Sequence, residues 1–186
     1  MTTPYLYQQE GISALEYFQG RALLADEMGL GKSLQALWYL KRNHKVCIPG
    51  IVVCPASLKW NWKEEAKRHI QCRATVLEGE KPPKNPKTPD RLYIINYDIL
   101  PHWIGWLKRL KPRLLVVDEC QCIKNRKAKR SKAVKELGKR IPHILALSGT
   151  PMVSLPAELF KTLNLIRPNL FPSFLKFGWD YCQPRR

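Results

Sequence analysis

Gly29, Gly31, Lys32 and Ser33 have the residue types and the spacing of a loop that binds phosphate. The short apolar run Ala22–Ala25 precedes them, and apolar residues at helical spacing follow. A glycine loop between a strand and a helix directs backbone N–H groups and the helix N-terminus at an anion. We therefore expect Lys32 to reach the outer phosphates of a nucleotide, and the Ser33 hydroxyl to bind Mg²⁺.

Asp26 departs from the general pattern of such loops, G-x-x-x-x-G-K-[ST], because it stands where the first glycine is expected. The alternative interpretation is an ordinary turn between a strand and a helix, with Lys32 on the surface. The combination Gly-x-Gly-Lys-Ser after an apolar strand is uncommon by chance, and it favours the phosphate loop.

A pair of carboxylates, Asp118 and Glu119, follows the apolar run Leu114–Val117. A carboxylate at the end of a buried strand, opposite a phosphate loop, is the second Mg²⁺ anchor of P-loop nucleotide hydrolases. We assign that role to Asp118, and we expect Glu119 to orient or deprotonate the attacking water. In the alternative, Asp118 caps the next segment and Glu119 faces solvent. The phosphate loop upstream weighs against that reading.

These residues need a scaffold in which strands and helices alternate, which predicts an α/β fold with a mostly parallel sheet and helices on both faces. The Pro- and Lys-rich stretch Gly79–Asp90 is predicted to be an exposed loop, and Ser57 is the expected N-cap of the helix that begins next to it. Strands are expected at Ala22–Ala25, Ile51–Cys54, Ala74–Leu77, Leu92–Asn96, Leu114–Asp118 and Ile144–Leu147, and helices at Tyr7–Phe18, Lys32–Arg42, Leu58–His69, Trp103–Leu110, Lys129–Leu137 and Leu155–Ile166.

In such a sheet, ligands bind outside the carboxyl ends of the strands. Four of the predicted strands end in the polar segments "PASLKWNW", "NYD", "DECQ" and "SGTP". All four segments should therefore lie at the same edge as the phosphate loop.

The composition sets the class of protein. The 186 residues fit one domain, or one lobe of something larger, with the 45% apolar and 25% charged content of a soluble globular protein. No run of about 18 apolar residues predicts a membrane span, and the N-terminus lacks the regions of a signal peptide. We therefore expect an intracellular protein with no membrane partner. The six cysteines form no C-x-x-C pair, so we expect reduced thiols and no zinc site.

The charge balance points to a polyanion. Lys and Arg number 32 against 15 Asp and Glu, which gives a net charge of +17. Basic residues gather in Lys81–Lys87, Lys108–Arg113 and Lys124–Arg140. One such cluster is usually a solvated face, but three of them on a small domain favour nucleic acid as the partner.

The order of these motifs resembles the first motor lobe of the Swi/Snf-type ATPases in helicase superfamily two. "YQQEGISAL" is similar to the family's adenine-reading segment, and "DEMGLGKS" to its phosphate loop, including Asp26. "VVCPASLKWNW" resembles motif Ia, "DECQCIKN" motif II and "LSGTPMVSLPAELF" motif III. The resemblance runs from about Tyr5 to Cys182, and the ending "FPSFLKFGWDYCQ" resembles most the annealing-helicase branch.

The resemblance implies one RecA-like lobe over residues 1–186 that binds ATP and Mg²⁺ and acts on DNA, double-stranded or branched, without reading its sequence. The resemblance implies that Gln8 contacts the adenine base of ATP and that the nucleotide also meets Asp26, Met28, Gly29, Gly31, Lys32 and Ser33. It implies that Lys32, Asp118 and Glu119 are catalytic, and that Ser33 and Asp118 bind the metal. For DNA it implies Pro55, Ser57, Leu58, Lys59, Asn96, Tyr97, Lys124 and Asn125, and for coupling the two sites Gln121, Ser148, Gly149 and Thr150.

The chain also departs from the family pattern. Ser33 replaces the usual Thr and keeps the hydroxyl, Gln121 stands where many relatives have His, and Cys120 stands where a smaller residue is common. The asparagine often found in motif III is missing. These changes should alter the coupling in detail without removing it.

Family members need a second motor lobe, which supplies arginines to the phosphate cleft. We expect that lobe to come from a C-terminal continuation or from another chain, and this chain alone to be weakly active or inactive. The methionine start suggests a natural beginning without an accessory N-terminal domain. The expected location is the nucleus in a eukaryote, or the cytoplasm in a prokaryote or a virus-infected host.

Two other functions remain open from the sequence: a small-molecule P-loop phosphotransferase, and a non-catalytic module that binds nucleic acid on the same fold. The first fits motif Ia and the charge of +17 poorly, and the second fits the intact Lys32, Asp118 and Glu119 poorly. Trp60 and Trp62 could stack on bases, although packing beneath the motif Ia helix is the favoured interpretation.

Overall fold

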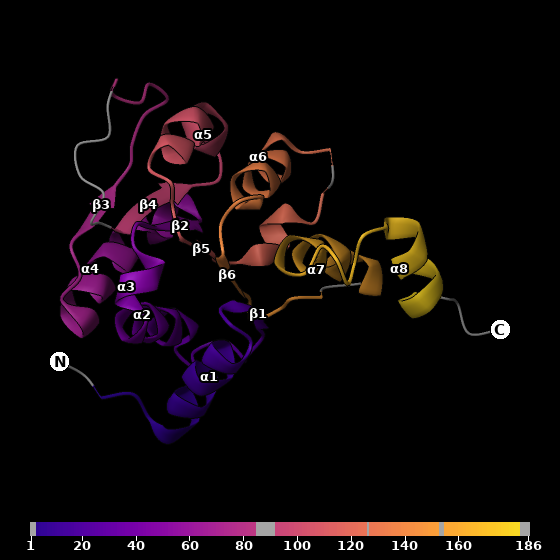
Figure 1. Ribbon diagram of the computed structural model, residues 1–186, viewed down its shortest axis with the longest axis horizontal. Coiled ribbons are helices and arrows are strands. Elements are labelled where there is room, and N and C mark those ends of the chain that lie inside the picture. The colour runs from indigo at the N-terminus through magenta and orange to yellow at the C-terminus, as the bar shows by residue number, and fades with distance from the viewer. Residues whose placement is uncertain (1–2, 85–91, 126, 153–154, 183–186) are drawn as a thin grey trace.

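Six strands form one parallel sheet in the order β1-β6-β5-β2-β4-β3 (Figure 1). The computed structural model describes residues 3–84, 92–125, 127–152 and 155–182. The strands are β1 (Arg21–Leu24), β2 (Gly50–Cys54), β3 (Ala74–Val76), β4 (Leu92–Asn96), β5 (Leu114–Val117) and β6 (His143–Leu147). Because all of them run in the same direction, their carboxyl ends meet at one edge of the sheet.

Helices cover both faces of the sheet. They are α1 (Leu6–Tyr17), α2 (Lys32–Arg42), α3 (His44–Cys47), α4 (Lys59–Ile70), α5 (Leu100–Arg109), α6 (Lys129–Gly138), α7 (Phe160–Ile166) and α8 (Phe174–Tyr181), with 3₁₀ turns η1 (Ala56–Leu58), η2 (Cys120–Ile123) and η3 (Pro156–Leu159). In the view of Figure 1, α1 and α2 lie below the strands and α5 and α6 above them. None of these helices is long and apolar enough to cross a membrane.

Alternate residues of each central strand pack into two separate cores. Val52 and Cys54 of β2 join the core under α1, α2 and α4, whereas Ile51 and Val53 join the core under α5, α6 and α7. All four are fully buried. A strand buried on both faces reads as a continuous apolar run, which is why the sequence pattern located it.

The α/β architecture predicted from the sequence is confirmed, and each predicted strand overlaps an observed one. The predicted N-cap is wrong. Ser57 lies inside η1, and Leu58 is the N-cap of α4, with no side-chain hydrogen bond to the helix. The run Pro55-Ala56-Ser57-Leu58 folds into a 3₁₀ turn that leads directly into α4, so the chain needs no side-chain cap there. The predicted loop Gly79–Asp90 is described only as far as Lys84.

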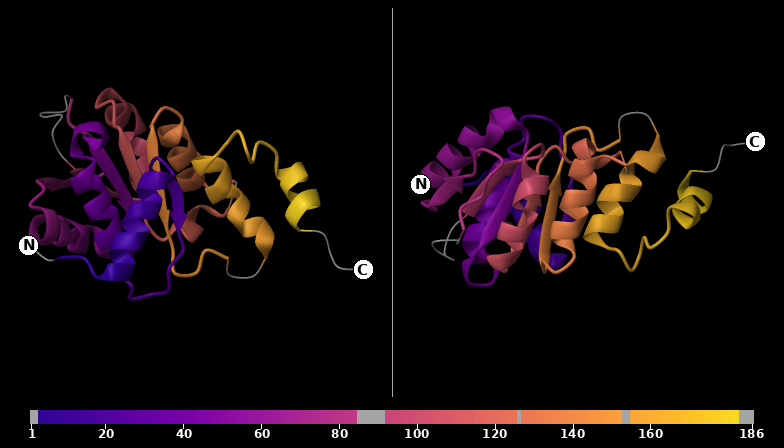
Figure 2. Two further views of the ribbon diagram at one scale, coloured as in Figure 1. Left: turned by 60° about the horizontal axis from the view of Figure 1, so that its bottom comes forward. Right: turned by 90° about the horizontal axis from the view of Figure 1, so that it is seen from above.

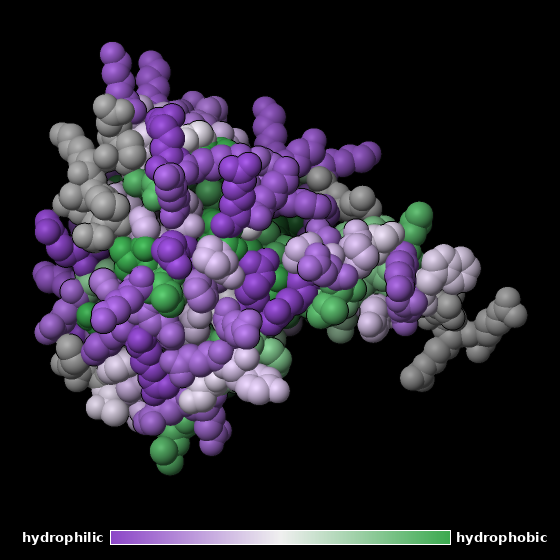
Figure 3. Space-filling view, in the orientation of Figure 1, coloured by the Kyte–Doolittle hydropathy of each residue, from purple (hydrophilic) through white to green (hydrophobic). Residues whose placement is uncertain are grey.

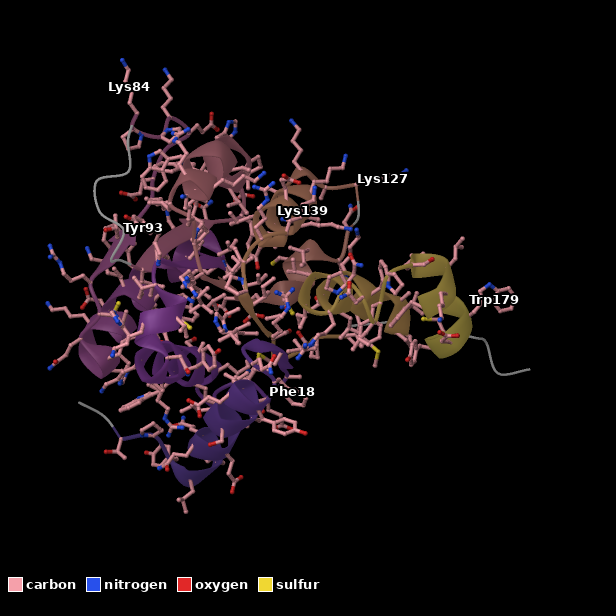
Figure 4. The ribbon with its side chains drawn as sticks, in the orientation of Figure 1. Phe18, Lys84, Tyr93, Lys127, Lys139 and Trp179 are labelled. Carbon is pink, nitrogen blue, oxygen red and sulfur yellow. The ribbon has the colours of Figure 1, made fainter. Side chains whose placement is uncertain are left out.

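The sequence did not predict α8, which lies at the C-terminal end, away from the sheet (Figure 2). Phe177 is buried against Phe160 and Phe171 from the preceding segment, and the Ser173 hydroxyl accepts a hydrogen bond from the backbone N–H of Lys176 at the start of the helix. Trp179, near the end of α8, is 70% exposed (Figure 4).

Basic side chains are a visible feature of the surface. Long hydrophilic side chains project from the upper edge of the view in Figure 3, over α5 and α6. Figure 4 labels Lys84, Lys127 and Lys139 on this side of the molecule. Lys139 and Lys108 both form ion pairs with Glu136, so part of the charge is neutralised locally.

Candidate nucleotide site and adjoining strand ends

The loop between β1 and α2 has the backbone geometry that its glycines permit. Gly29 and Gly31 have φ angles of +87° and +73°, in the left-handed region that other residues resist. Gly31 is the N-cap of α2, and Lys32 is the first residue of the helix. The Lys32 ammonium donates hydrogen bonds to the carbonyl oxygens of Asp26 at 2.7 Å and Glu27 at 2.8 Å. The Lys32 side chain therefore lies against the phosphate loop, with its ammonium bonded to two loop carbonyls.

Asp26, the residue that departs from the general pattern, has a structural contact. Its Oδ2 accepts a 2.8 Å hydrogen bond from Nε2 of Gln35, which is fully buried in α2. Gln35 also lies 3.4 Å from the carbonyl oxygen of Leu30. The carboxylate thus ties the start of the loop to the helix that follows it.

Gln8 joins α1 to the same loop. Its Nε2 donates to the carbonyl oxygen of Leu30 at 3.3 Å, and its Oε1 accepts from the N–H of Tyr5 at 3.0 Å. The side chain is only 4% exposed. Tyr5 and Tyr7 stack beside it, with ring centroids 5.9 Å apart. The contact of Gln8 with the adenine base stays a prediction.

Asp118 lies at the carboxyl end of β5 and is 7% exposed. Its Oδ2 accepts a 2.8 Å hydrogen bond from Trp62 Nε1, and its Oδ1 accepts a 3.0 Å bond from the N–H of Glu119. Burial raises the pKa of Asp118 above its ordinary value, and the negative charge of Glu119 adds to this. The Trp62 hydrogen bond and the nearby Lys32 charge act in the opposite direction on that pKa.

A chain of hydrogen bonds runs from Glu119 to the end of β6. Oε2 of Glu119 accepts from Gln121 Nε2 at 2.6 Å, and Oε1 of Gln121 accepts from the Ser148 hydroxyl at 2.7 Å. Ser148 Oγ in turn accepts from the N–H of Thr150 at 3.0 Å. Glu119 itself has a left-handed backbone, with φ of +48°. The residues expected to couple the two sites are in direct contact.

Gly149 brings the end of β6 against the phosphate loop. A Cβ atom at this position would lie 2.6 Å from Cγ of Met28 and 3.4 Å from Nζ of Lys32. Only glycine fits without moving Met28. The three segments after β1, β5 and β6 therefore meet, as the parallel order β1-β6-β5 requires.

The residues at this edge suit ATP and Mg²⁺. Phosphate is bound by the kinds of group found here: left-handed glycines, a helix N-terminus and a lysine. The lysine is held by two loop carbonyls. Mg²⁺ prefers oxygen ligands, and the Ser33 hydroxyl and the Asp118 carboxylate are of that type.

The residues predicted to contact DNA follow β2, β4 and β5, which are neighbours in the sheet. Ser57 on η1 is exposed, as are Lys124 and Asn125 after η2. Pro55 and Leu58 are half-buried, and Asn96 is 7% exposed with its amide 3.4 Å from Asp98 Oδ2. The segments that carry these residues therefore follow one another along the edge of the sheet, in the order of β5, β2 and β4.

Two members of that set have buried side chains instead. The ammonium of Lys59 donates to the carbonyl oxygen of Leu77 at 3.3 Å and is almost covered. Tyr97 is 4% exposed, and its hydroxyl donates to the carbonyl oxygen of Asp118. The expectation of direct phosphate contacts through these two side chains needs correction, because both are buried and both polar groups already have partners in the chain, which for Lys59 include Glu78 at 4.0 Å.

Trp62 makes a contact with the site that the sequence did not reveal. The favoured prediction, that Trp60 or Trp62 packs beneath the helix, is right for Trp62, which is 2% exposed. Trp60 is 51% exposed and lies under the ammonium of Lys63, which is 4.9 Å from the ring centroid. The spacing of Trp62 and Ala66, four residues apart, predicts from the sequence that both lie on the buried face of α4. It does not predict which atom accepts the hydrogen bond of the Trp62 indole N–H.

Comparisons with known proteins agree with this geometry. A family model described as the SNF2-related domain matches residues 7–184. A Caenorhabditis elegans protein, the SWI/SNF-related matrix-associated actin-dependent regulator of chromatin subfamily A-like protein 1 homolog, is 38% identical over 97% of this chain and 26% of its own length. The Bos taurus SWI/SNF-related matrix-associated actin-dependent regulator of chromatin subfamily A-like protein 1 is 34% identical over 97% of this chain and 19% of its own length. The chain thus spans about a quarter or less of these relatives.

Solved structures also match. The Sulfolobus solfataricus SWI2/SNF2 ATPase core in complex with dsDNA has a TM-score of 0.82 and 30% identity, over 97% of this chain and 39% of that chain. A second structure, of the Sulfolobus solfataricus SWI2/SNF2 ATPase core domain, gives a TM-score of 0.80 and 30% identity, over 97% of this chain and 38% of that chain. The resemblance and the RecA-like lobe expected from the motifs are confirmed.

Proposed function

The chain belongs to the SNF2-related domain family, and on that premise we propose that it is the ATP-binding motor lobe of a DNA-dependent ATPase that moves along double-stranded DNA. The observation that carries the proposal is the meeting of three segments at one sheet edge: the phosphate loop, the Asp118–Glu119 pair and Ser148–Thr150. A site that only bound phosphate would need the first of them alone.

Each residue of the site has a role in this proposal. Lys32 exchanges its two loop carbonyls for phosphate oxygens, and Ser33 and Asp118 hold Mg²⁺. The cation, when bound, neutralises charge that develops on the phosphates. Glu119 is held through Oε2 by Gln121, and we assign its other oxygen to the attacking water. Gln8 lies beside the loop and Met28 within it, and both would meet the rest of the nucleotide.

The DNA track is the row of strand ends next to this site. We assign phosphate contacts to the segments that hold Pro55, Ser57, Leu58, Asn96, Lys124 and Asn125. The donors in these segments are backbone N–H groups, the polar side chains of Ser57, Asn96 and Asn125, and the Lys124 ammonium, which position DNA without reading its sequence. Pro55 has no N–H and contributes its backbone conformation. Lys59 and Tyr97 support the track from beneath. The Sulfolobus solfataricus core of similar structure was solved in complex with dsDNA, which supports a duplex partner, and branched DNA stays a prediction.

A second motor lobe completes the enzyme in this proposal, from a continuation of the chain or from another chain. The chain covers 39% of the Sulfolobus solfataricus core, which supports a larger working unit. The names of its relatives refer to chromatin, which supports a nuclear location if the source is a eukaryote. A cytoplasmic location in a prokaryote or a virus-infected host stays a prediction.

Titration calorimetry with a slowly hydrolysed ATP analogue and Mg²⁺ tests the nucleotide site. A lysine bound to phosphate contributes about 1.5–3 kcal/mol, so Lys32→Ala should weaken the analogue by about 10- to 100-fold. Lys132→Ala, an exposed lysine of α6, is the control and should bind as the unmodified chain does. Equal affinity in all three proteins would exclude the phosphate loop. Turnover of a nucleoside monophosphate without DNA would instead support a small-molecule phosphotransferase.

A further inference from the structure

Donors from two other segments hold Asp118 in place. The indole N–H of Trp62, from the first turns of α4, donates to Oδ2 at 2.8 Å. The hydroxyl of Tyr97, just after β4, donates to the backbone carbonyl oxygen of Asp118. The third donor is the N–H of Glu119, 3.0 Å from Oδ1. Trp62, Tyr97 and Asp118 are 2%, 4% and 7% exposed, so water does not compete strongly for these bonds.

The plane of a carboxylate is otherwise loosely defined, because rotation about its terminal bond has broad minima. Mg²⁺ demands near-ideal octahedral geometry with short bonds to oxygen. A carboxylate that turns freely would lose entropy each time it bound the cation. Donors on both oxygens of Asp118 fix the plane in advance and leave the remaining lone pairs for the metal.

Tyr97 acts on the backbone at the same point. Asp118 is followed at once by Glu119, whose φ of +48° turns the chain sharply away from β5. A hydroxyl bonded to the Asp118 carbonyl fixes the peptide unit that makes this turn. The position of both acidic side chains therefore depends on a residue at the end of β4, which β2 separates from β5 in the sheet.

We propose that Trp62 and Tyr97 are positioning residues for Asp118, which set its carboxylate for the divalent cation that accompanies the nucleotide. This inference rests on the proposed function, because it needs Asp118 to be a metal ligand. It adds that the orientation of the carboxylate is set from α4 and the end of β4. Both elements belong to the row of segments assigned to DNA, so a shift in that row would reach the metal ligand through one hydrogen bond.

An experiment can distinguish the positioning role of Trp62 from a purely structural role in the core. Trp103 is a matched control, since it is also buried at 3% exposure and its indole N–H also donates to an oxygen, the carbonyl of Gly79, at 2.7 Å. Trp62→Phe and Trp103→Phe each remove one such bond and a similar volume. Only the first removes a donor from Asp118.

The measurement is the affinity of the chain for a slowly hydrolysed ATP analogue as a function of Mg²⁺ concentration, and again in EDTA. Loss of a hydrogen bond that orients a metal ligand typically costs about 10- to 100-fold in metal affinity. Trp62→Phe should raise the Mg²⁺ concentration at half-saturation by about that factor, with Tyr97→Phe changing it in the same direction. The affinity in EDTA should stay the same, and Trp103→Phe should match the unmodified chain throughout.

A second measurement needs no change at Trp62. The chain has six tryptophans and hence six indole N–H signals by NMR. Asp118→Asn should shift one of them strongly, and Mg²⁺ with the analogue should shift the same signal in the unmodified chain. The inference is overturned if no signal responds to both changes, or if Trp62→Phe folds and needs no more Mg²⁺ than Trp103→Phe. Failure of the unmodified chain to bind the analogue would overturn the proposed function and this inference together.

Discussion

The Ser148 hydroxyl donates a 2.7 Å hydrogen bond to Oε1 of Gln121, and this bond joins the end of β6 to the end of β5. Gln121 uses its other amide atom to hold Glu119 at 2.6 Å. A displacement of either strand end therefore changes the orientation of the carboxylate assigned to the attacking water.

Ser148→Ala should destabilise the chain. It removes the donor to Gln121 and the acceptor for the Thr150 N–H, and Ser148 is 1% exposed. We expect a free energy of unfolding lower by about 1–3 kcal/mol in urea. Ser13→Ala is the control, because Ser13 is exposed and bonds only locally to the Gln9 carbonyl, so a change within about 0.5 kcal/mol is expected. Equal losses at the two sites would contradict a tight contact between β5 and β6.

DNA binding should depend on Lys124 but not on Lys59. If about four phosphates are neutralised, the logarithm of affinity should fall with the logarithm of salt at a slope of about −3.6. Lys124→Ala should reduce that slope by about 0.9, because we assign its ammonium, which pairs with Glu158 at 3.1 Å in the free chain, to a DNA phosphate. Lys59→Met should leave the slope unchanged, since the ammonium bonds to the Leu77 carbonyl.

The control for the salt experiment is Lys84→Ala, an exposed lysine in the stretch that follows β3. Its slope should equal that of the unmodified chain. Equal reductions for Lys84 and Lys124 would mean that the charge acts diffusely, and that the track along the strand ends is wrong.

A polypeptide limited to these 186 residues should hydrolyse ATP slowly, and duplex DNA should barely increase the rate. An arginine supplied to a transferring phosphoryl group contributes about 10³–10⁵ in rate, and we expect that arginine on a second lobe. Phosphate release measured with and without DNA checks this. Strong DNA-stimulated turnover that Glu119→Gln abolishes would show that one lobe is sufficient.

His143 should make stability depend on pH. Burial lowers its pKa below the ordinary value of 6.5, and the positive charges of Arg113 and Arg21 add to this, against a hydrogen bond to the Gln19 backbone. Tyr39 OH lies 2.9 Å from its Nδ1. Between pH 6.5 and the lower pKa of the folded chain, the unfolded chain binds more protons at this residue, so the free energy of unfolding falls as the pH drops from 6.5 through the pKa of the folded chain.

The check is the free energy of unfolding in urea at pH 7.5 and pH 5.5, for the unmodified chain and for His143→Gln. The difference between the two pH values should shrink in His143→Gln. His102→Gln changes an exposed histidine of α5 and should retain the full difference. A larger difference in His143→Gln would contradict the assigned direction of the pKa shift.

The sequence predicted the sheet well because its strands are short apolar runs buried on both faces. Gly50–Cys54 and Leu92–Asn96 are buried at every position, and their short length separates such runs from buried helices. α8 escaped prediction because it is eight residues long and follows a Pro-containing turn, so too few apolar positions repeat to reveal a helix. Ser57 has the residue type of an N-cap, but the 3₁₀ turn η1 overrides that preference.

Within the site, the sequence located the segments but not all of the contacts. The glycines, Lys32 and the acidic pair were identified because their chemistry requires fixed spacing along the chain. The bonds from Trp62 and Tyr97 to Asp118 join residues far apart in sequence, and nothing in their own neighbourhood distinguishes them from core residues. Lys59 shows the converse, since a lysine at the start of a helix looks exposed until its partner, the Leu77 carbonyl, is known.

The order of the strands has a consequence for how the chain is made. β1, β2 and β3 precede residue 84, and among the described residues they pair only with β4, β5 and β6. A ribosome that has released the first half of the chain has thus delivered three strands with no partner among them. Sheet formation must wait until translation reaches β4. For the same reason, a finished chain cleaved after Lys84 should migrate as one particle in a native gel, because every described strand of the first fragment pairs with strands of the second.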